Sequence, residues 1–223
     1  KPQVVLETKI IEITSKTSQP LDFEETLARV LAGLPKNRKD GRSPLASLTE
    51  FLKASQPADA SKKPSLIAVL DDPQVQVVMR KLSQRKGVDL MASPRLVAQA
   101  GEVSRSFGRL PGQKEQAAGQ NTGVTLEMLP EVRDSSALDL TLDPKIVEFD
   151  GFQDDARGAK KPVFNVRSSH ARVSMESGQT ALIDIGSRTD SQQVEDIAPS
   201  GKTEARTDRY TRWAVAFVTA RVM

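Results

Sequence analysis

The sequence of 223 residues contains no cysteine. This absence excludes disulfide bonds, thiol catalysis and thiolate metal sites. It does not decide the compartment, since a reducing compartment and a periplasmic protein without disulfides both fit. No apolar run approaches the ~18 residues that a membrane-spanning helix needs. The first residues, Lys1 to Glu7, show no signal peptide, so either the signal is absent or the chain is a mature or trimmed form.

Aromatic residues and an excess of one charge are also scarce. The chain has one tryptophan and one tyrosine, and its 32 basic and 29 acidic residues are scattered together to give a net charge of +3. A charge this small gives no strong field of one sign, and few rings are available to stack on bases. We therefore expect no nucleic-acid partner. The 38% apolar and 27% charged residues are ordinary for a globular protein.

The combinations of residues that carry chemistry are missing as well. No G-x-S-x-G nucleophile motif occurs, and the GRLPG stretch at 108–112 lacks the Lys-Ser/Thr ending of a phosphate-binding loop. His170, the only histidine, has no cysteine or second histidine nearby to share a metal, and we expect it on the polar face of a strand. Five aspartates could suggest a calcium site, but they lack EF-hand spacing; they are Asp139, Asp143, Asp150, Asp154 and Asp155. Two glutamate pairs, Glu24 with Glu25 and Glu127 with Glu131, are pairs only in sequence, and glycosidase chemistry needs two carboxylates placed across a substrate. We therefore predict no catalytic, cofactor-binding or metal-binding residues, and a protein that is not an enzyme.

An amphipathic helix within residues 66–97 sets the register of the chain. Asp72 can cap its N-terminus, and Pro73 suits the first turn. One apolar stripe faces a core, because its members recur at helical spacing; they are Val75, Val78, Met79 and Leu82. Lys81 is expected on the solvent face. Gly87 closes the helix, because glycine adopts the left-handed conformation readily.

Strands are predicted on both sides of this helix. Residues 3–14 form a two-faced strand, expected to be central. Residues 88–91 and 94–98 form two extended segments separated by a bend at Ser93-Pro94. A hairpin pairs strands at 124–128 and 138–142, and further strands follow at 103–107, 146–149, 171–175 and 181–185. The C-terminal strand at 213–218 can pair with the N-terminal one.

Two more helices and several loops complete the pattern. One helix carries Phe23, Leu27, Val30, Leu31 and Leu34 behind an Asp22 cap, and the next carries Leu45, Leu48, Phe51 and Leu52 behind Ser43. Polar composition predicts a basic loop at 36–42, a linker at 56–64, a flexible loop at 108–121, a mobile stretch at 151–161 and a long charged loop at 186–210.

Several stretches, taken in order, resemble the bacterial secretin domain, the ring-forming module of type II and type III secretion and type IV pilus outer-membrane channels. They are VVLETKIIEIT from Val4, LDDPQVQVVMRKLSQRKGVDLMASPRLVAQAGEVSRSF from Leu70, NTGVTLEMLPEV from Asn121, LDLTLDPKIVEFDGF from Leu138, FNVRSSHARVSMESGQTALIDIG from Phe164 and RWAVAFVTARV from Arg212. The resemblance implies an α+β fold with a mixed, largely antiparallel sheet and helices on one face. It also implies a single domain over residues 1–223. The insertion at about 20–56 departs from the pattern, because channel-forming members have barrel strands there and its periodicity here is helical.

Departures from the secretin pattern shape the expected function. Channel-forming members follow their equivalent of ALIDIG with an amphipathic segment that forms a lip against the membrane, but residues 187–212 are too polar to bury an apolar face in lipid. Members with a working gate place β-hairpins where this chain has the loop at 108–121. The resemblance thus implies a divergent member without gate and lip, and no direct membrane insertion is expected.

The favoured hypothesis is a non-enzymatic structural or assembly component of a type IV pilus or type II secretion-like system. Its expected partners are other pilus or secretion-system proteins, with a homo-oligomer possible, and its expected location is the periplasm or the outer-membrane surface. One alternative is a secretin subunit of an outer-membrane channel ring. Another is a periplasmic ligand- or glycan-binding module, which would need a concave apolar pocket lined by Trp213 or by phenylalanines.

Overall fold

The computed structural model describes residues 1–16, 23–36, 43–54, 65–113, 116–197 and 203–223. Its three helices are α1 (Phe23–Leu31), α2 (Pro44–Ala54) and α3 (Asp72–Ser83). None of the helices in these ranges has the length and apolar character required to cross a membrane. The predicted loop at 36–42 and linker at 56–64 lie almost wholly outside the described residues, as does Asp22.

A six-stranded sheet is built around the N-terminal strand β1 (Gln3–Lys16). The order is β2-β12-β13-β1-β3, and β4 also pairs with β1. The other strands are β2 (Leu66–Leu70), β3 (Val88–Ala92), β4 (Arg95–Gln99), β12 (Thr180–Ile197) and β13 (Thr203–Val222). The predicted pairing of the two terminal strands is confirmed, because Val4 lies opposite Val222 and Lys16 opposite Tyr210.

A second, five-stranded sheet has the order β10-β9-β8-β5, and β11 also pairs with β9. Its strands are β5 (Ser104–Gly108), β8 (Gly123–Val132), β9 (Ala137–Asp154), β10 (Lys160–Ser168) and β11 (Ala171–Glu176). A small hairpin of β6 (Gln116–Ala117) and β7 (Gln120–Asn121) completes the described strands. The largely antiparallel character is confirmed, since every pairing among these strands is antiparallel.

The first sheet is the middle layer of the molecule and contributes to two cores. Toward the second sheet it presents small side chains of β13, such as Ala214 and Ala216, which leave room for the leucines of β9. Toward the helices it presents Val215 and Phe217 of the same strand, which pack with buried residues of the helices; these are Leu27, Val30, Leu31, Leu48, Val78 and Leu82. Burial on both faces explains the apolar runs at 4–6 in β1 and 214–218 in β13.

The organising helix is confirmed with two changes at its ends. Its N-cap is Asp71 and not Asp72, because the Gln74 side chain accepts a hydrogen bond from the Asp71 backbone N–H at 2.9 Å and completes a capping box. It ends at Ser83, before the predicted position. Gly87 instead shapes the turn into β3, with φ +77° and its carbonyl 2.7 Å from the Thr14 amide. A Cβ at Gly87 would lie 2.8 Å from the Thr14 carbonyl oxygen, so only glycine fits.

Lys81 does not lie free on the solvent face as predicted. Its Nζ donates to the carbonyl oxygens of Val30 and Ala32, at 3.1 and 3.3 Å. These carbonyls belong to the C-terminal end of α1, where backbone acceptors lack helical partners and a cation is favoured. Lys81 therefore ties α3 to α1.

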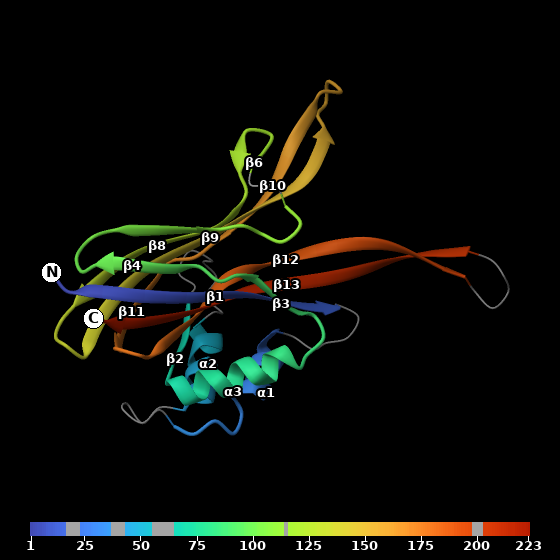
Figure 1. Cartoon of the computed structure of the whole chain (residues 1–223). Coiled ribbons are helices and arrows are strands. Elements are labelled where there is room, and N and C mark those ends of the chain that lie inside the picture. Colours follow the sequence, from blue (N-terminus) through green and yellow to red (C-terminus); the bar gives the residue numbers. More distant parts are fainter. Residues whose placement is uncertain (17–22, 37–42, 55–64, 114–115, 198–202) are drawn as a thin grey trace.

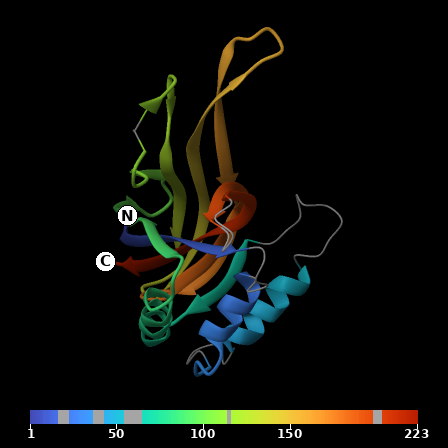
Figure 2. The ribbon, with the colours of Figure 1, turned by 90° about the vertical axis from the view of Figure 1, so that its right-hand side faces the viewer.

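Three segments predicted as loops are β-structure, so those predictions are wrong. Residues 108–121 contain the β6–β7 hairpin, whose turn residues Ala118 and Gly119 both have positive φ, as a type I′ turn requires. Residues 151–161 belong largely to β9 and β10, and residues 186–210 belong largely to β12 and β13. Residues 151–161 and 186–210 lie where these ribbons extend away from the core (Figures 1 and 2), and within these two ranges neither face shows the apolar alternation that marks a half-buried strand.

The contribution of the α3 stripe to stability can be measured with a matched pair of substitutions. Leu82 is fully buried between α3 and the middle sheet, so Leu82→Ala should lower the free energy of unfolding by ~2–5 kcal/mol through lost transfer energy and cavity formation. Arg80→Ala, on the exposed side of the same helix, should change it by no more than ~0.5 kcal/mol. Denaturant unfolding checks both, and equal costs would mean that the stripe does not face the core.

Candidate functional site

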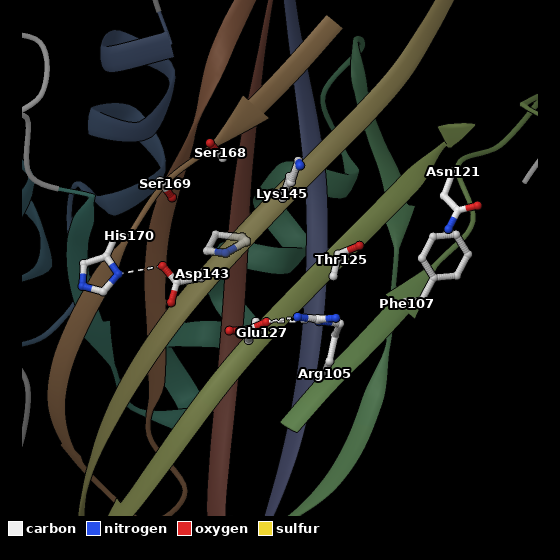
Figure 3. A pocket seen from close by; sticks show the side chains of 11 residues that line it. Arg105, Phe107, Asn121, Thr125, Glu127, Asp143, Lys145, Ser168, Ser169 and His170 are labelled. Atoms are coloured by element: carbon white, nitrogen blue, oxygen red, sulfur yellow. Dashed lines mark hydrogen bonds and ion pairs between the residues drawn. The ribbon is translucent and has the colours of Figure 1, made fainter. Parts of the chain in front are cut away.

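An open hollow lies on the outer face of the second sheet (Figure 3). Strands β5, β8 and β9 form its floor, and the β10–β11 connection forms one side. The lining is mostly polar: Arg105, Phe107, Asn121, Thr125, Glu127, Asp143, Pro144, Lys145, Ser168, Ser169 and His170. It contains one aromatic ring, and Trp213 packs against the helix-side core instead. The hollow therefore lacks the aromatic apolar lining that a glycan-binding site would need.

Cross-strand ion pairs fix the side chains of the hollow. Arg105 donates to Glu127 from the neighbouring strand, with Nε 3.1 Å from Oε2. His170 Nδ1 lies 2.6 Å from Asp143 Oδ1. These side chains are between one third and two thirds exposed, so each pair contributes little to stability. Lys145 lies two residues after Asp143 on the same face of β9. It makes no ion pair with any residue in the described ranges.

The structure brings Ser169, His170 and Asp143 together, which the sequence did not predict. A Ser-His-Asp triad needs the serine hydroxyl hydrogen-bonded to the second imidazole nitrogen. The Ser169 Oγ is buried and has no hydrogen-bond partner in the part of the chain that the structure describes. The triad is therefore not assembled. His170 also differs from its predicted place, because it lies in the connection before β11 and is exposed.

The candidate carboxylates are separated from one another and satisfied by different partners. Asp139 bonds Ser174, Asp150 pairs with Arg188 at 2.9 Å, and Asp155 accepts the amide N–H groups of Arg157 and Ala159 in the β9–β10 turn. Glu127 and Glu131 each pair with a different arginine, Asp154 is exposed, and the side chains of Glu24 and Glu25 lie outside the described residues. Within the described ranges no three histidine, aspartate or glutamate side chains converge as a metal site would require.

Phe107 owes its position to a glycine on the neighbouring strand. Gly123 has φ +143°, and a Cβ there would lie 2.7 Å from both the Phe107 ring and the Gly108 carbonyl. The Phe107 ring therefore fills the space that a side chain at position 123 would occupy. In this position the ring also covers the backbone of Gly123. Phe107 remains 44% exposed and forms the apolar end of the hollow.

A buried charge cluster lies between the two sheets, where their ribbons diverge. Arg167 of β10, whose side chain is 3% exposed, donates from Nη2 to Glu12 of β1 and to Glu148 of β9, both at 2.8 Å. Arg188 of β12 lies 3.2 Å from Glu148 and 2.9 Å from Asp150. The cluster therefore joins four strands of both sheets at the base of the β9–β10 and β12–β13 ribbons.

Arg188 is held in its charged form by the carboxylates around it. Burial lowers the pKa of Arg188, but hydrogen bonds from its guanidinium to Asp190 and Asp150 outweigh burial and raise that pKa above its ordinary value. Arg212 pairs with Asp190 at 2.9 Å and with Glu12 at 3.6 Å, which extends the cluster to β13. A buried cluster of this kind holds its geometry tightly, because loss of one member leaves an uncompensated charge.

Farther along β13, Asp208 faces Lys16 at the end of β1, with Nζ 2.6 Å from Oδ2. The hydrogen bond from Lys16, helped by the charge of Arg206, keeps the pKa of Asp208 below its ordinary value. This pair ties the start of the β12–β13 ribbon to the central strand.

The sequence reasoning missed this cluster. The two-faced strand predicted at 3–14 contains Glu12, but its pattern does not indicate that this carboxylate is buried. One signal was available, since Glu12 lies between Ile11 and Ile13, and a buried charge needs a partner of opposite sign.

Comparisons with known proteins place the chain beside secretins. It is similar to a chain of the Klebsiella pneumoniae type II secretion outer membrane complex of PulD, PulS and the PulC HR domain (15% identity, TM-score 0.47), to the type II secretion secretin GspD of Escherichia coli K12 (14%, 0.45) and to the Vibrio cholerae type IV competence pilus secretin PilQ (14%, 0.45). Each match covers 100% of this chain but only 40%, 50% and 61% of the other chain. No family model matches the chain. No curated protein sequence matches it either. The chain is thus similar to secretins over its whole length, as its sequence segments predict.

The energetic weight of the charge cluster can be compared with that of an exposed pair. Glu148→Ala should lower the free energy of unfolding by ~3–5 kcal/mol, because it leaves Arg167 buried without one of its carboxylates. Glu131→Ala removes an exposed partner of Arg172 and should cost no more than ~1 kcal/mol. Both values come from denaturant unfolding. Similar small costs for both would show that the cluster does not join the sheets.

Proposed function

We propose that this chain is a non-enzymatic structural or assembly component of a type IV pilus or type II secretion-like system and acts through protein–protein contacts. One observation carries the proposal. The β9–β10 ribbon projects from the core and keeps large apolar side chains in solvent, with Phe152 60% and Val166 50% exposed. A contiguous apolar patch on an otherwise polar surface is typical of a contact site for another protein.

The arrangement of the resembling segments supports the same proposal. Each quoted stretch forms strands or the helix α3 of one two-sheet structure, in the order that the secretin pattern implies. We further propose that residues 1–223 form a single secretin-like domain, with helices on one face of the middle sheet and a helical insertion at about residues 20–56. The proposed partners are other pilus or secretion-system proteins, in the periplasm or at the outer membrane.

The distal β12–β13 ribbon has the wrong chemistry for contact with lipid. Its described side chains at 187–194 and 205–212 are almost all polar or charged, and within it Asp190 pairs with Arg212 and Asp208 with Arg206. Burying such charges in hydrocarbon would be costly. The ribbon therefore fits a contact with water or protein better than one with a membrane.

A secretin subunit of a channel ring is the second candidate. The observation that favours it is the pairing of residues 186–197 with 203–214, since an ordered ribbon stands where a loop was expected. Its backbone edges can accept strands from neighbouring copies, as any unpaired edge can. The two candidates differ in the size of the assembly that the chain forms alone.

The mass of the purified chain in solution separates the candidates. We expect a monomer or dimer by light scattering coupled to size-exclusion chromatography, and no release of dye from liposomes, because the β12–β13 ribbon is polar. Liposomes mixed with a known pore-forming protein provide the positive control. Detergent-resistant rings or dye release would contradict the structural role and support the channel subunit.

A further inference from the structure

One face of the β9–β10 ribbon carries an apolar stripe, in which Val147 is buried and Phe152, Pro162 and Val166 are exposed. Strand register places three pairs directly opposite one another, with Val147 facing Val166, Phe149 facing Phe164 and Phe152 facing Pro162. A bulge between the second and third pair keeps them on one face, because the register shifts there by one residue. The ring centroid of Phe149 lies 5.4 Å from that of Phe164 and 5.3 Å from that of Phe152, the latter edge to face. We call these six residues the ribbon stripe.

The ribbon stripe reverses the pattern of the strand that carries it. Nearer the core, β9 turns leucines inward and polar residues outward, with Asp139 and Asp143 on the outer face. From Val147 onward the outward residues are apolar, while Glu148 and Asp150 turn inward to the charge cluster. Solvent alone gives no reason for this reversal, so the stripe is shaped for something that covers it.

Unpaired cations border the ribbon stripe. Lys145 lies at its lower end beside the hollow, and Arg157 and Lys160 lie near the turn; all three are exposed and make no ion pair with the described residues. Lys161 is paired with Asp155, and Asp154 is the one exposed acid of the ribbon tip without such a pair in those ranges. The ribbon therefore presents an apolar strip with an excess of positive charge around it.

We propose that the ribbon stripe and the adjoining hollow form a docking surface for an extended amphipathic segment of a partner protein, apolar along its length and acidic at its ends. The acidic end nearer the core would be received by Lys145, and the apolar side chains would cover the phenylalanines. This inference rests on the proposed function and specifies the chemistry of its partner. Charge complementarity of this kind sets the choice and orientation of a partner more than its affinity.

Two other occupants fit the observations less well. A second copy laid face to face would bring the unpaired cations of both ribbons together, and like charges in contact are unfavourable. A lipid surface would be met first by the ribbon tip, where residues 153–161 include no large apolar side chain to enter the bilayer. Hydrogen bonds from the amides of Ala159 and Arg157 hold the pKa of Asp155 below its ordinary value, so this carboxylate stays charged. The stripe lies on the side of the ribbon, where a protein segment can run along it.

Defined peptides test the proposal without knowledge of the natural partner. One labelled peptide alternates leucine and threonine between glutamate-rich ends, and its counterpart has lysine-rich ends. Fluorescence anisotropy should show saturable binding of the acidic peptide to the full chain, and about tenfold weaker binding of the basic one. Vesicles of anionic lipid and unlabelled chain serve as competing occupants.

Matched variants locate the binding. Val166→Ser and Lys160→Glu should each weaken binding of the acidic peptide, together by about tenfold or more. Val97→Ser and Lys86→Glu are the controls, because Val97 on β4 is as exposed as Val166 (54% against 50%) and Lys86 is exposed on the helix side. Unchanged thermal unfolding of each variant confirms that it is folded.

Several results would overturn the inference. They are equal binding of both peptides, no binding of either, equal effects of test and control variants, or competition by anionic vesicles or by the chain itself. These outcomes are distinguishable from failure of the proposed function. If the chain is a monomer and binds neither peptide, only this docking surface is contradicted. If the chain forms a detergent-resistant ring, the structural role is contradicted regardless of peptide binding.

Discussion

The pairing of β1 with β13 is the interaction on which the rest of the structure depends. It runs from Val4 opposite Val222 to Lys16 opposite Tyr210, and it joins the two ends of the chain into the centre of the middle sheet. Each of the two strands contributes side chains to both cores, so their pairing aligns the second sheet and the helices with one another. A slip of one residue would exchange the two faces, which would put the alanines against the helices and Phe217 against the second sheet.

The contacts between the two sheets change from apolar to ionic where the middle sheet is no longer buried on both faces. Apolar packing holds the sheets together over most of their length, and the charge cluster around Arg167 replaces it at the point where the ribbons leave the core. Buried arginine and carboxylate groups restrict the relative positions of the strands more than apolar contacts do, since a buried charge without a partner is costly. The direction of each ribbon, and with it the orientation of the exposed phenylalanines, is thereby tied to the middle sheet. The surface we propose for partner binding is thus supported by the ionic cluster behind it.

The amino-acid sequence predicted the parts of this fold in which one face is buried. The strand at 3–14, the hairpin around residues 133–136 and the helix α3 follow from apolar periodicity, which records burial directly. The ribbon segments at 151–161 and 186–197 could not be predicted in this way, because they are mostly polar and are held by backbone hydrogen bonds that any residue can make. The charge cluster could not be predicted from the sequence for a different reason. Its members Glu12 and Arg167 are 155 residues apart, and only the folded topology brings them together.

The candidate surface shows the same division. Phe149, Phe152 and Phe164 are visible in the sequence as apolar residues, but nothing local indicates that they share a face, since that depends on the bulge between β9 and β10.

Native-state hydrogen exchange tests the central claim, that a middle sheet buried on both faces supports polar ribbons, most directly. The account predicts that amides of β1 and β13 between residues 4–13 and 213–222 exchange slowest, through global unfolding, and that amides at 188–194 and 204–209 exchange much faster through local opening. Equal protection of ribbon and centre, or rapid exchange in β1, would contradict it.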